Sequence, residues 1–110
     1  MLAGIHRASV EYLAECEEDY RLWKQHNVTL GRPGVELGDT RTYGMPIAFD
    51  RFLGYYPTPS ERIRAQEAMR GLEAQGLLKV YGLRATRVKL TEAGLAKLKE
   101  LGATDGPATE

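Results

Sequence analysis

Residues 57–94 constrain the fold more strongly than any other part of this 110-residue chain. The segment reads PTPSERIRAQEAMRGLEAQGLLKVYGLRATRVKLTEAG, and the spacing of its apolar residues changes from a helical period to a strand period and back. Thr58, Pro59 and Glu61 fit the cap, first and third positions of a helix that begins with a capping box. We therefore predict a helix over residues 59–75, which Gly76 ends in a left-handed conformation.

This predicted helix has one apolar face. Ala65, Met69 and Leu72 recur at spacings of four and three, which places them along one side of a helix. The opposite side is expected to face solvent or a partner, and it holds Ile63, Arg64, Glu67, Arg70 and Gly71, with Gln66 at its border.

Two strands and another helix are expected after Gly76. Apolar and polar residues alternate over residues 78–81 and again over residues 87–90, as they do in strands that bury one face. The two strands form a hairpin over residues 77–91 with a basic tip. Thr91 then caps a helix over residues 92–101, whose apolar face contains Ala93, Leu95, Leu98 and Leu101.

The stretch AMRGLEAQGLLKV, followed by TRVKLTEAG, resembles the winged helix-turn-helix DNA-binding family, especially bacterial regulators of the multiple-antibiotic-resistance type. The shared pattern is an arginine-rich helix ending in Leu-Glu-x-x-Gly-Leu, then a wing, then Leu-Thr-x-x-Gly, and it covers about a third of the chain. The resemblance implies an α+β, mainly helical fold, with an N-terminal helix and a two- or three-stranded antiparallel wing sheet. It also implies that residues 59–75 are a DNA-recognition helix, although winged helices serve as protein-interaction modules too.

An N-terminal helix is expected over about residues 8–24, from the helical spacing of Leu13, Cys16, Tyr20 and Trp23. Its other face is acidic. The aromatic residues Tyr12, Tyr20 and Trp23 either pack onto the winged module or pack against a second copy as a homodimer. Internal packing is favoured, because a chain of this length has little other material to complete its core.

Residues 27–39 are rich in glycine and proline and predict a surface loop or a short hairpin. A short strand is expected within residues 41–45, and a short helix over residues 46–53 as the first helix of a helix-turn-helix pair. The link over residues 54–57 is longer than is usual for that motif. Residues 1–101 are thus predicted to form a single domain, and residues 102–110 a disordered tail.

Charge is unevenly distributed along a chain whose formal net charge is zero. Residues 60–90 carry seven basic and three acidic side chains, a net of plus four, whereas residues 1–30 carry three basic and five acidic side chains, a net of minus two. Positive charge therefore concentrates on the module that would meet a nucleic acid.

Double-stranded DNA is the predicted partner, and each candidate residue has a role. Arg64 and Arg70 would contact guanine or phosphate, Gln66 would pair with adenine, and Ser60 would hold a phosphate at the helix start. The hairpin would add Lys79, Arg84, Arg87 and Lys89 along the backbone or in the minor groove. Glu67 departs from this pattern, because a carboxylate repels phosphate unless it accepts from cytosine or pairs with an arginine.

Two function classes compete. The favoured one is a DNA-binding transcriptional regulator, and the alternative is a winged-helix protein-interaction module of a plasmid, phage or other mobile element. Enzymatic activity is not expected, because no cysteine or carboxylate stands at metal-ligand spacing from the two histidines, His6 and His26, and no phosphate-binding loop or nucleophile motif occurs. No cofactor is expected.

The remaining sequence features predict a cytoplasmic location and an inert thiol. No apolar run approaches eighteen residues, and the first residues lack the apolar block of a signal peptide. Cys16, the single cysteine, is expected to be buried on its helix. Aromatic residues near the short helix could line an effector site, but core packing explains them more simply.

Overall fold

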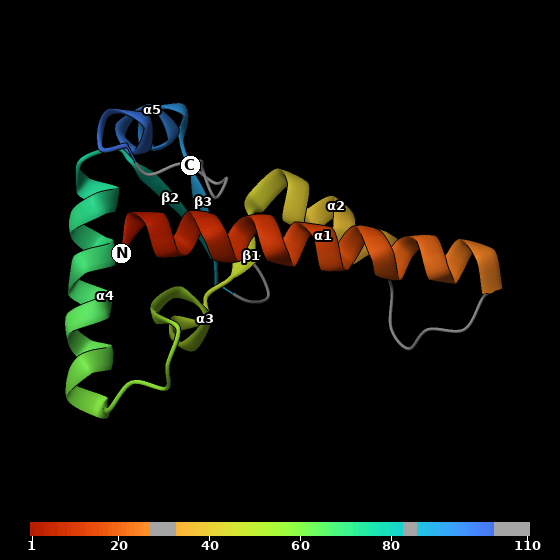
Figure 1. The fold of residues 1–110 in the computed structure, drawn as a ribbon, viewed down its shortest axis with the longest axis horizontal. Helices are drawn as coiled ribbons and strands as arrows, with labels where there is room; N and C mark the ends of the chain where they lie inside the picture. Colours follow the sequence, from red (N-terminus) through yellow and green to blue (C-terminus); the bar gives the residue numbers. More distant parts are fainter. Residues whose placement is uncertain (27–32, 83–85, 103–110) are drawn as a thin grey trace.

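The computed structural model describes residues 1–26, 33–82 and 86–102, and it shows an α+β arrangement that is mostly helical (Figure 1). In chain order the elements are α1 (Leu2–His26), α2 (Pro33–Tyr43), β1 (Met45–Pro46), α3 (Phe49–Leu53), α4 (Pro59–Ala74), β2 (Leu78–Gly82), β3 (Thr86–Leu90) and α5 (Glu92–Glu100). The strands form an antiparallel sheet in the order β1-β3-β2. The predicted α+β class and the antiparallel hairpin are confirmed.

The core lies where the first turns of α1 cross the sheet. Ile5, Met45, Leu78 and Val88 are its largest fully buried side chains. Met45 is opposite Val88 in the β1–β3 pairing, and Val80 is opposite Val88 in the β2–β3 pairing, so the middle strand β3 supplies the centre of this face. Burial of such side chains is the main driving force for the fold.

The N-terminal helix starts earlier than predicted. It begins at Leu2 rather than near residue 8, because Leu2, Ile5 and Ala8 share the face that packs into the core. The apolar positions predicted farther along this helix are only partly buried. Cys16 is buried as expected, whereas Trp23 remains 40% exposed. The later turns of α1 extend away from the sheet with α2 alongside them (Figure 1).

Helix α2 was not predicted, since its sequence had suggested a loop or hairpin. Proline is well suited to the first turn of a helix, which accounts for Pro33 at the start, and Leu37 and Thr40 are then buried beside α1. Tertiary packing outweighs the weak helix propensity of its two glycines.

The short elements that follow are displaced relative to the prediction. Residues 41–43 belong to α2, so β1 is confined to Met45–Pro46. Pro46 lies in that strand and not in a helix, and α3 begins at Phe49 after Ala48 in an extended conformation. Gly54 ends α3 in the left-handed region, at φ 85°.

The structure of the segment from α4 to α5 agrees closely with the prediction from the sequence. Thr58 accepts a hydrogen bond from the Glu61 N–H while the Glu61 side chain accepts one from the Thr58 N–H, which confirms the capping box. Helix α4 ends at Ala74, and Gly76 has φ 78°. The Thr91 side chain caps α5 as predicted. The tip of the hairpin, residues 83–85, and the predicted tail beyond residue 102 lie outside the described residues.

The buried face of α5 differs from the predicted one. Gly94 and Leu98 are buried, whereas Leu95 and Leu101 are exposed. A glycine is needed because a Cβ atom at position 94 would lie only 2.2 Å from the Leu77 carbonyl oxygen. This backbone approach lets α5 lie close to the start of β2.

Gly94→Ala should therefore destabilise the protein by about 1–3 kcal/mol, because backbone must move to admit the methyl group. Gly71→Ala is the matched control, since an added Cβ there meets no atom within 4 Å and alanine favours the helix by roughly 0.5–1 kcal/mol. Urea unfolding of both variants measures the difference. Equal stability of the two variants would contradict the close contact at Gly94.

Candidate nucleic-acid interface

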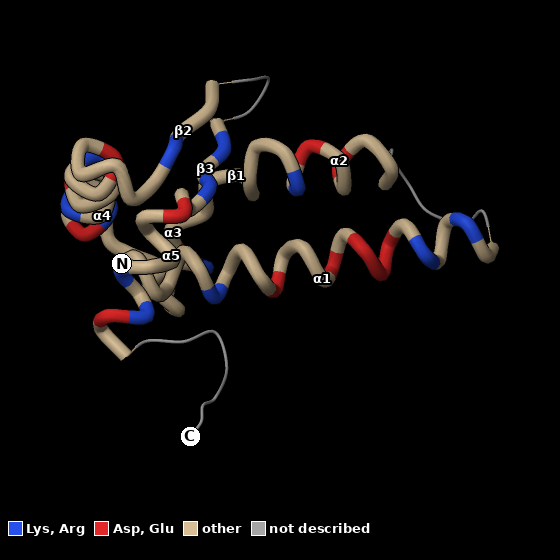
Figure 2. Tube along the Cα trace, turned by 90° about the horizontal axis from the view of Figure 1, so that it is seen from above, with Lys and Arg blue, Asp and Glu red and all other residues tan. Residues whose placement is uncertain are grey.

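Helix α4 forms one end of the body and is exposed along most of its surface (Figure 1). Ala65 and Met69 of the predicted apolar face are buried, and Leu72, its third member, is half-buried. Helix α4 is not positively charged along its whole length. It carries three arginines and three glutamates, and both colours appear on it in Figure 2.

The arginines of α4 differ from the other arginines in their partners. In the described part of the chain, Arg21, Arg41, Arg51 and Arg87 each form an ion pair with a glutamate, and Arg7 donates to the Arg51 carbonyl. Within that same part, no hydrogen bond or ion pair is made by the side chain of Arg62, Arg64 or Arg70.

The glutamates of α4 are in part engaged. The Glu61 carboxylate accepts from the Thr58 N–H, and the Glu73 carboxylate accepts from the Val80 N–H at 3.2 Å. Val80 lies on β2, an edge strand, so Glu73 satisfies a backbone donor that would otherwise face outward. Glu67 is exposed on the outer side of the helix.

The three arginines point in different directions around α4. At about 100° per residue, Arg62 lies close to the buried face, Arg70 lies on the same flank about 80° farther round, and Arg64 lies on the opposite flank. Ser60 and Ile63 are also exposed on the outer half of the helix. The predicted pair Arg64 and Arg70 is thus separated by about 120° around the axis rather than lying side by side.

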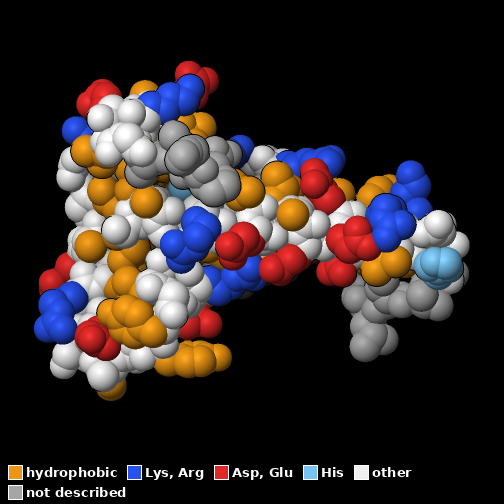
Figure 3. All heavy atoms as spheres, viewed as in Figure 1, with side chains coloured by type: hydrophobic (Ala, Val, Ile, Leu, Met, Phe, Trp, Pro, Cys, Tyr) orange, Lys and Arg blue, Asp and Glu red, His pale blue; other side chains and the backbone are white. Residues whose placement is uncertain are grey.

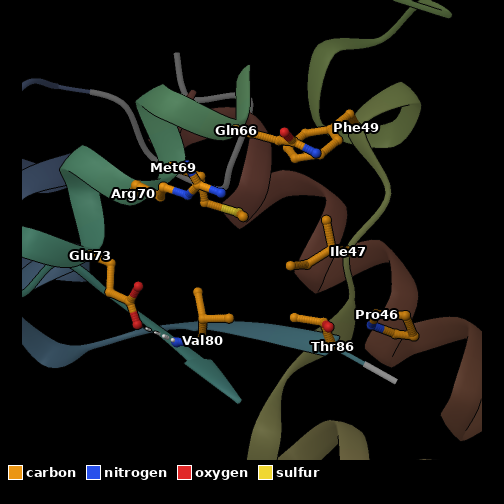
Figure 4. Close-up of a pocket in the computed structure, with 9 residues that line it drawn as sticks. All are labelled: Pro46, Ile47, Phe49, Gln66, Met69, Arg70, Glu73, Val80 and Thr86. Carbon is orange, nitrogen blue, oxygen red and sulfur yellow. Dashed lines mark hydrogen bonds between the residues drawn. The ribbon is translucent and has the colours of Figure 1, made fainter. Parts of the chain in front are cut away.

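A hollow of about 610 Å³ lies beside α4, between this helix, the start of α3 and the hairpin (Figure 4). Met69 and Ile47 point toward one another across it, with Val80 below and Phe49 above. Gln66 and Arg70 line the α4 side. Two predicted site residues, Gln66 and Arg70, therefore lie together at this hollow. Arg64, a third predicted residue, does not line it.

The basic residues of the hairpin do not share this hollow. Val80 and Thr86 face it, and because side chains alternate across a strand, Lys79, Tyr81 and Lys89 belong to the other face of the sheet. That other face is the one beside α2. Tyr81 packs edge-on against Tyr43, and the Lys89 ammonium donates to the Arg41 carbonyl at 2.8 Å.

Arg87 is a structural residue and not the free hairpin cation that was predicted. It is 6% exposed, and its guanidinium donates to both oxygens of Glu36 at 2.9 Å and to the Gly44 carbonyl at 2.8 Å. The alternating pattern had placed it on a solvent face, but α2, which was not predicted, covers that face. Arg84, also predicted, lies outside the described residues.

A network of polar contacts extends from Arg87 to α1. The Tyr12 hydroxyl donates to Glu36 at 2.6 Å, Thr40 also donates to Glu36, and the Cys16 sulfur is 3.7 Å from the Thr40 hydroxyl. Three elements, α1, α2 and β3, therefore meet at the Glu36 carboxylate.

Burial and hydrogen bonding act in opposite directions on this carboxylate. Burial raises the pKa of Glu36, but the hydrogen bonds from Tyr12 and Arg87 outweigh it and hold the pKa below its ordinary value. Burial, with the bond to Glu36, raises the pKa of Tyr12, and burial likewise raises the pKa of Cys16. The neutral phenol and the neutral thiol fit the expectation that this cysteine is unreactive.

Two features of the site were missed in the sequence. Arg62 was not predicted as a site residue. It lies one turn before Gln66 on the same side of α4, and the four-residue spacing in the sequence already indicated this. The apolar hollow depends on Ile47 and Phe49 near the start of α3, on Met69 of α4 and on Val80 of β2, so no local pattern indicates it.

Comparison of this chain with protein-family models, with curated proteins and with solved structures gave no match. Among residues 1–26, 33–82 and 86–102, no helix is both long and apolar enough to cross a membrane. The same residues contain no group of three or more His, Cys, Asp or Glu side chains that could hold a metal ion.

Arg87→Met should lower the free energy of unfolding by about 1–3 kcal/mol, because it removes the guanidinium that donates to the Gly44 carbonyl and forms the ion pair with the Glu36 carboxylate. Arg64→Met is the matched control and should change stability by less than about 0.5 kcal/mol, since Arg64 is exposed. Chemical denaturation of both variants provides the measurement. Similar stabilities would show that the Arg87 network contributes little.

The lowered pKa of Glu36 predicts a pH dependence with a definite sign. The ionised form is favoured in the folded state, so its contribution is complete above the unfolded value of about 4.3 and is lost as the pH falls through the folded pKa. Glu36→Gln removes this titration. The stability difference between wild type and variant should therefore shrink below about pH 4, as measured by unfolding between pH 3 and 7. A difference that grows as the pH falls would refute the assignment.

Proposed function

We propose that this protein binds double-stranded DNA through α4 as a winged helix, with the β2–β3 hairpin as the wing. The order of two helices, a strand, two helices, a hairpin and a helix supports this interpretation, as does the antiparallel sheet order β1-β3-β2. The observation that carries it is that the arginines without an internal partner among the described residues all lie on α4.

Unpaired arginines on an exposed helix suit a polyanion. An arginine that already has a carboxylate partner must lose that partner before it can bind a phosphate, whereas an unpaired one loses only water. In a major groove, Arg62 and Arg64 on the two flanks of α4 would each reach a phosphate backbone. Glu67, opposite the buried face, would then face the base edges, and Arg70, on the flank beside the hollow, would reach the same backbone as Arg62.

The remaining predicted contacts take secondary positions in this proposal. Ser60 lies in the first turn of α4, where a helix start can hold a phosphate, although the N–H groups of Glu61 and Arg62 are already bound to Thr58. Gln66 faces the hollow and so lies at the edge of the duplex contact. Lys79 and Lys89 face the opposite side of the sheet, from which long lysine side chains would reach the backbone only around the strand edge.

A protein-interaction role is the second candidate, and exposed apolar side chains favour it. Tyr56 is 88% exposed, Ile63 56% and Tyr55 52%, all near the start of α4. Figure 3 shows hydrophobic side chains gathered on this end of the body. Tyrosine and arginine are common among the residues that dominate protein interfaces.

Duplex binding is tested by fluorescence anisotropy with random-sequence labelled duplexes at increasing salt. Affinity should fall steeply with salt, and Arg62→Ala and Arg64→Ala should each reduce the salt slope by about one. Arg21→Ala is the control, because Arg21 lies on α1 and pairs with Glu18, and its slope should equal that of the wild type.

The absence of measurable binding to any duplex at low salt would exclude this function. Co-purification of a protein partner together with that result, and loss of the partner on Tyr56→Ala, would support the interaction module instead.

A further inference from the structure

Two adjoining hollows lie beside α4. The hollow already described adjoins a second one of about 440 Å³, and the two share Ile47, Phe49 and Gln66 in their linings. We call the joined feature the α4 groove. At one end it reaches Glu73, Val80 and Thr86, and at the other it reaches Tyr56 and Arg62.

The α4 groove combines an apolar floor with polar groups at its edges. Ile47, Phe49, Met69 and Val80 form much of the floor. Gln66 belongs to both hollows, and Arg62 and Arg70 stand about 12 Å apart along the helix, one toward each end. Two carboxylates also line it: Glu73, which is bound to the Val80 N–H, and Asp50, in the first turn of α3.

A fully paired duplex on α4 would leave this floor in contact with water. In a duplex the flat faces of the bases are stacked on one another, and the apolar group that the major groove offers is the thymine methyl. An unpaired base is different, because its face is free to stack on apolar or aromatic side chains and its edge is free to hydrogen-bond.

We propose that the α4 groove binds an unpaired nucleobase next to the duplex that α4 contacts. This inference rests on the proposed function and specifies its target as DNA containing an extruded or unpaired base. Phe49 and Met69 contact the face of the base, the Gln66 amide contacts its edge, and Arg62 and Arg70 hold the phosphates on either side. Tyr56, which projects into solvent at the mouth of the groove, stacks on the neighbouring base.

An extended peptide suits the same groove less well. A peptide strand that docks on a sheet edge needs free backbone donors on that edge, and the Val80 N–H of edge strand β2 is already bound to Glu73. The three unpaired arginines of α4 also match the charge of a nucleic-acid backbone.

The experiment compares three labelled duplexes of the same sequence. One is fully paired, one contains a single unpaired adenine, and one carries an abasic residue at the position of that adenine. The duplex with the unpaired adenine should bind roughly tenfold or more tightly than the paired duplex, and the abasic one should not share this gain. With 2-aminopurine as the unpaired base, binding should also change its fluorescence.

Tyr56→Ala and Phe49→Leu should remove most of the preference for the unpaired base while leaving affinity for the paired duplex unchanged. Tyr55→Ala is the matched control: this neighbouring tyrosine is exposed but lines neither hollow, so the preference should persist. Tyr56 is almost fully exposed, so its variant should fold even if Phe49→Leu does not.

Each alternative outcome is decisive. Equal affinity for the paired and the unpaired duplex would overturn the inference and leave the proposed function standing. An equal gain from the abasic duplex would also overturn it, because flexibility of the DNA would then be the cause. Binding to none of the three duplexes would exclude both the inference and the proposed function.

Discussion

The guanidinium of Arg87 joins the two parts of this molecule. It lies on the central strand β3, yet its hydrogen bonds go to the Gly44 carbonyl and to Glu36 of α2, and Tyr12 of α1 donates to the same carboxylate. A short helix with two glycines has little stability of its own, so α2 depends on this contact and on its packing against α1. The buried Arg87 side chain therefore fixes the position of the β2–β3 hairpin relative to α1 and α2.

The same contact changes how the charge of the chain is to be understood. Residues 60–90 have a net charge of plus four in the sequence, which indicated a basic helix and hairpin acting together. In the structure, Arg87 is internal and Lys79 and Lys89 lie on the sheet face beside α2. The cations that remain available beside the hollow are on α4, so the arrangement of charge, more than its sum, supports the proposed function.

Local signals predicted local structure well. The capping box at Thr58 and Glu61, the left-handed Gly76 and the alternation in both hairpin strands each depend on residues close in sequence, and each is present. Helix α2 was missed because glycine and proline at its start are typical of loops, while its stability comes from α1 and β3. Arg87 was misplaced for the same reason: a strand position appears exposed until the element that covers it is known. The α4 groove, which joins residues of distant segments, could not be predicted from spacing at all.

The separation of α3 and α4 is determined by elements other than these two helices. α3 packs on α1, where Arg51 pairs with Glu15 and the Arg51 carbonyl accepts from Arg7, while α4 packs on β2. Direct packing between α3 and α4 is slight. The first half of α1 thus sets the dimensions of the proposed binding surface, whose residues come much later in the sequence. A substitution on α1 that leaves every groove residue unchanged would still alter which molecules that surface accepts.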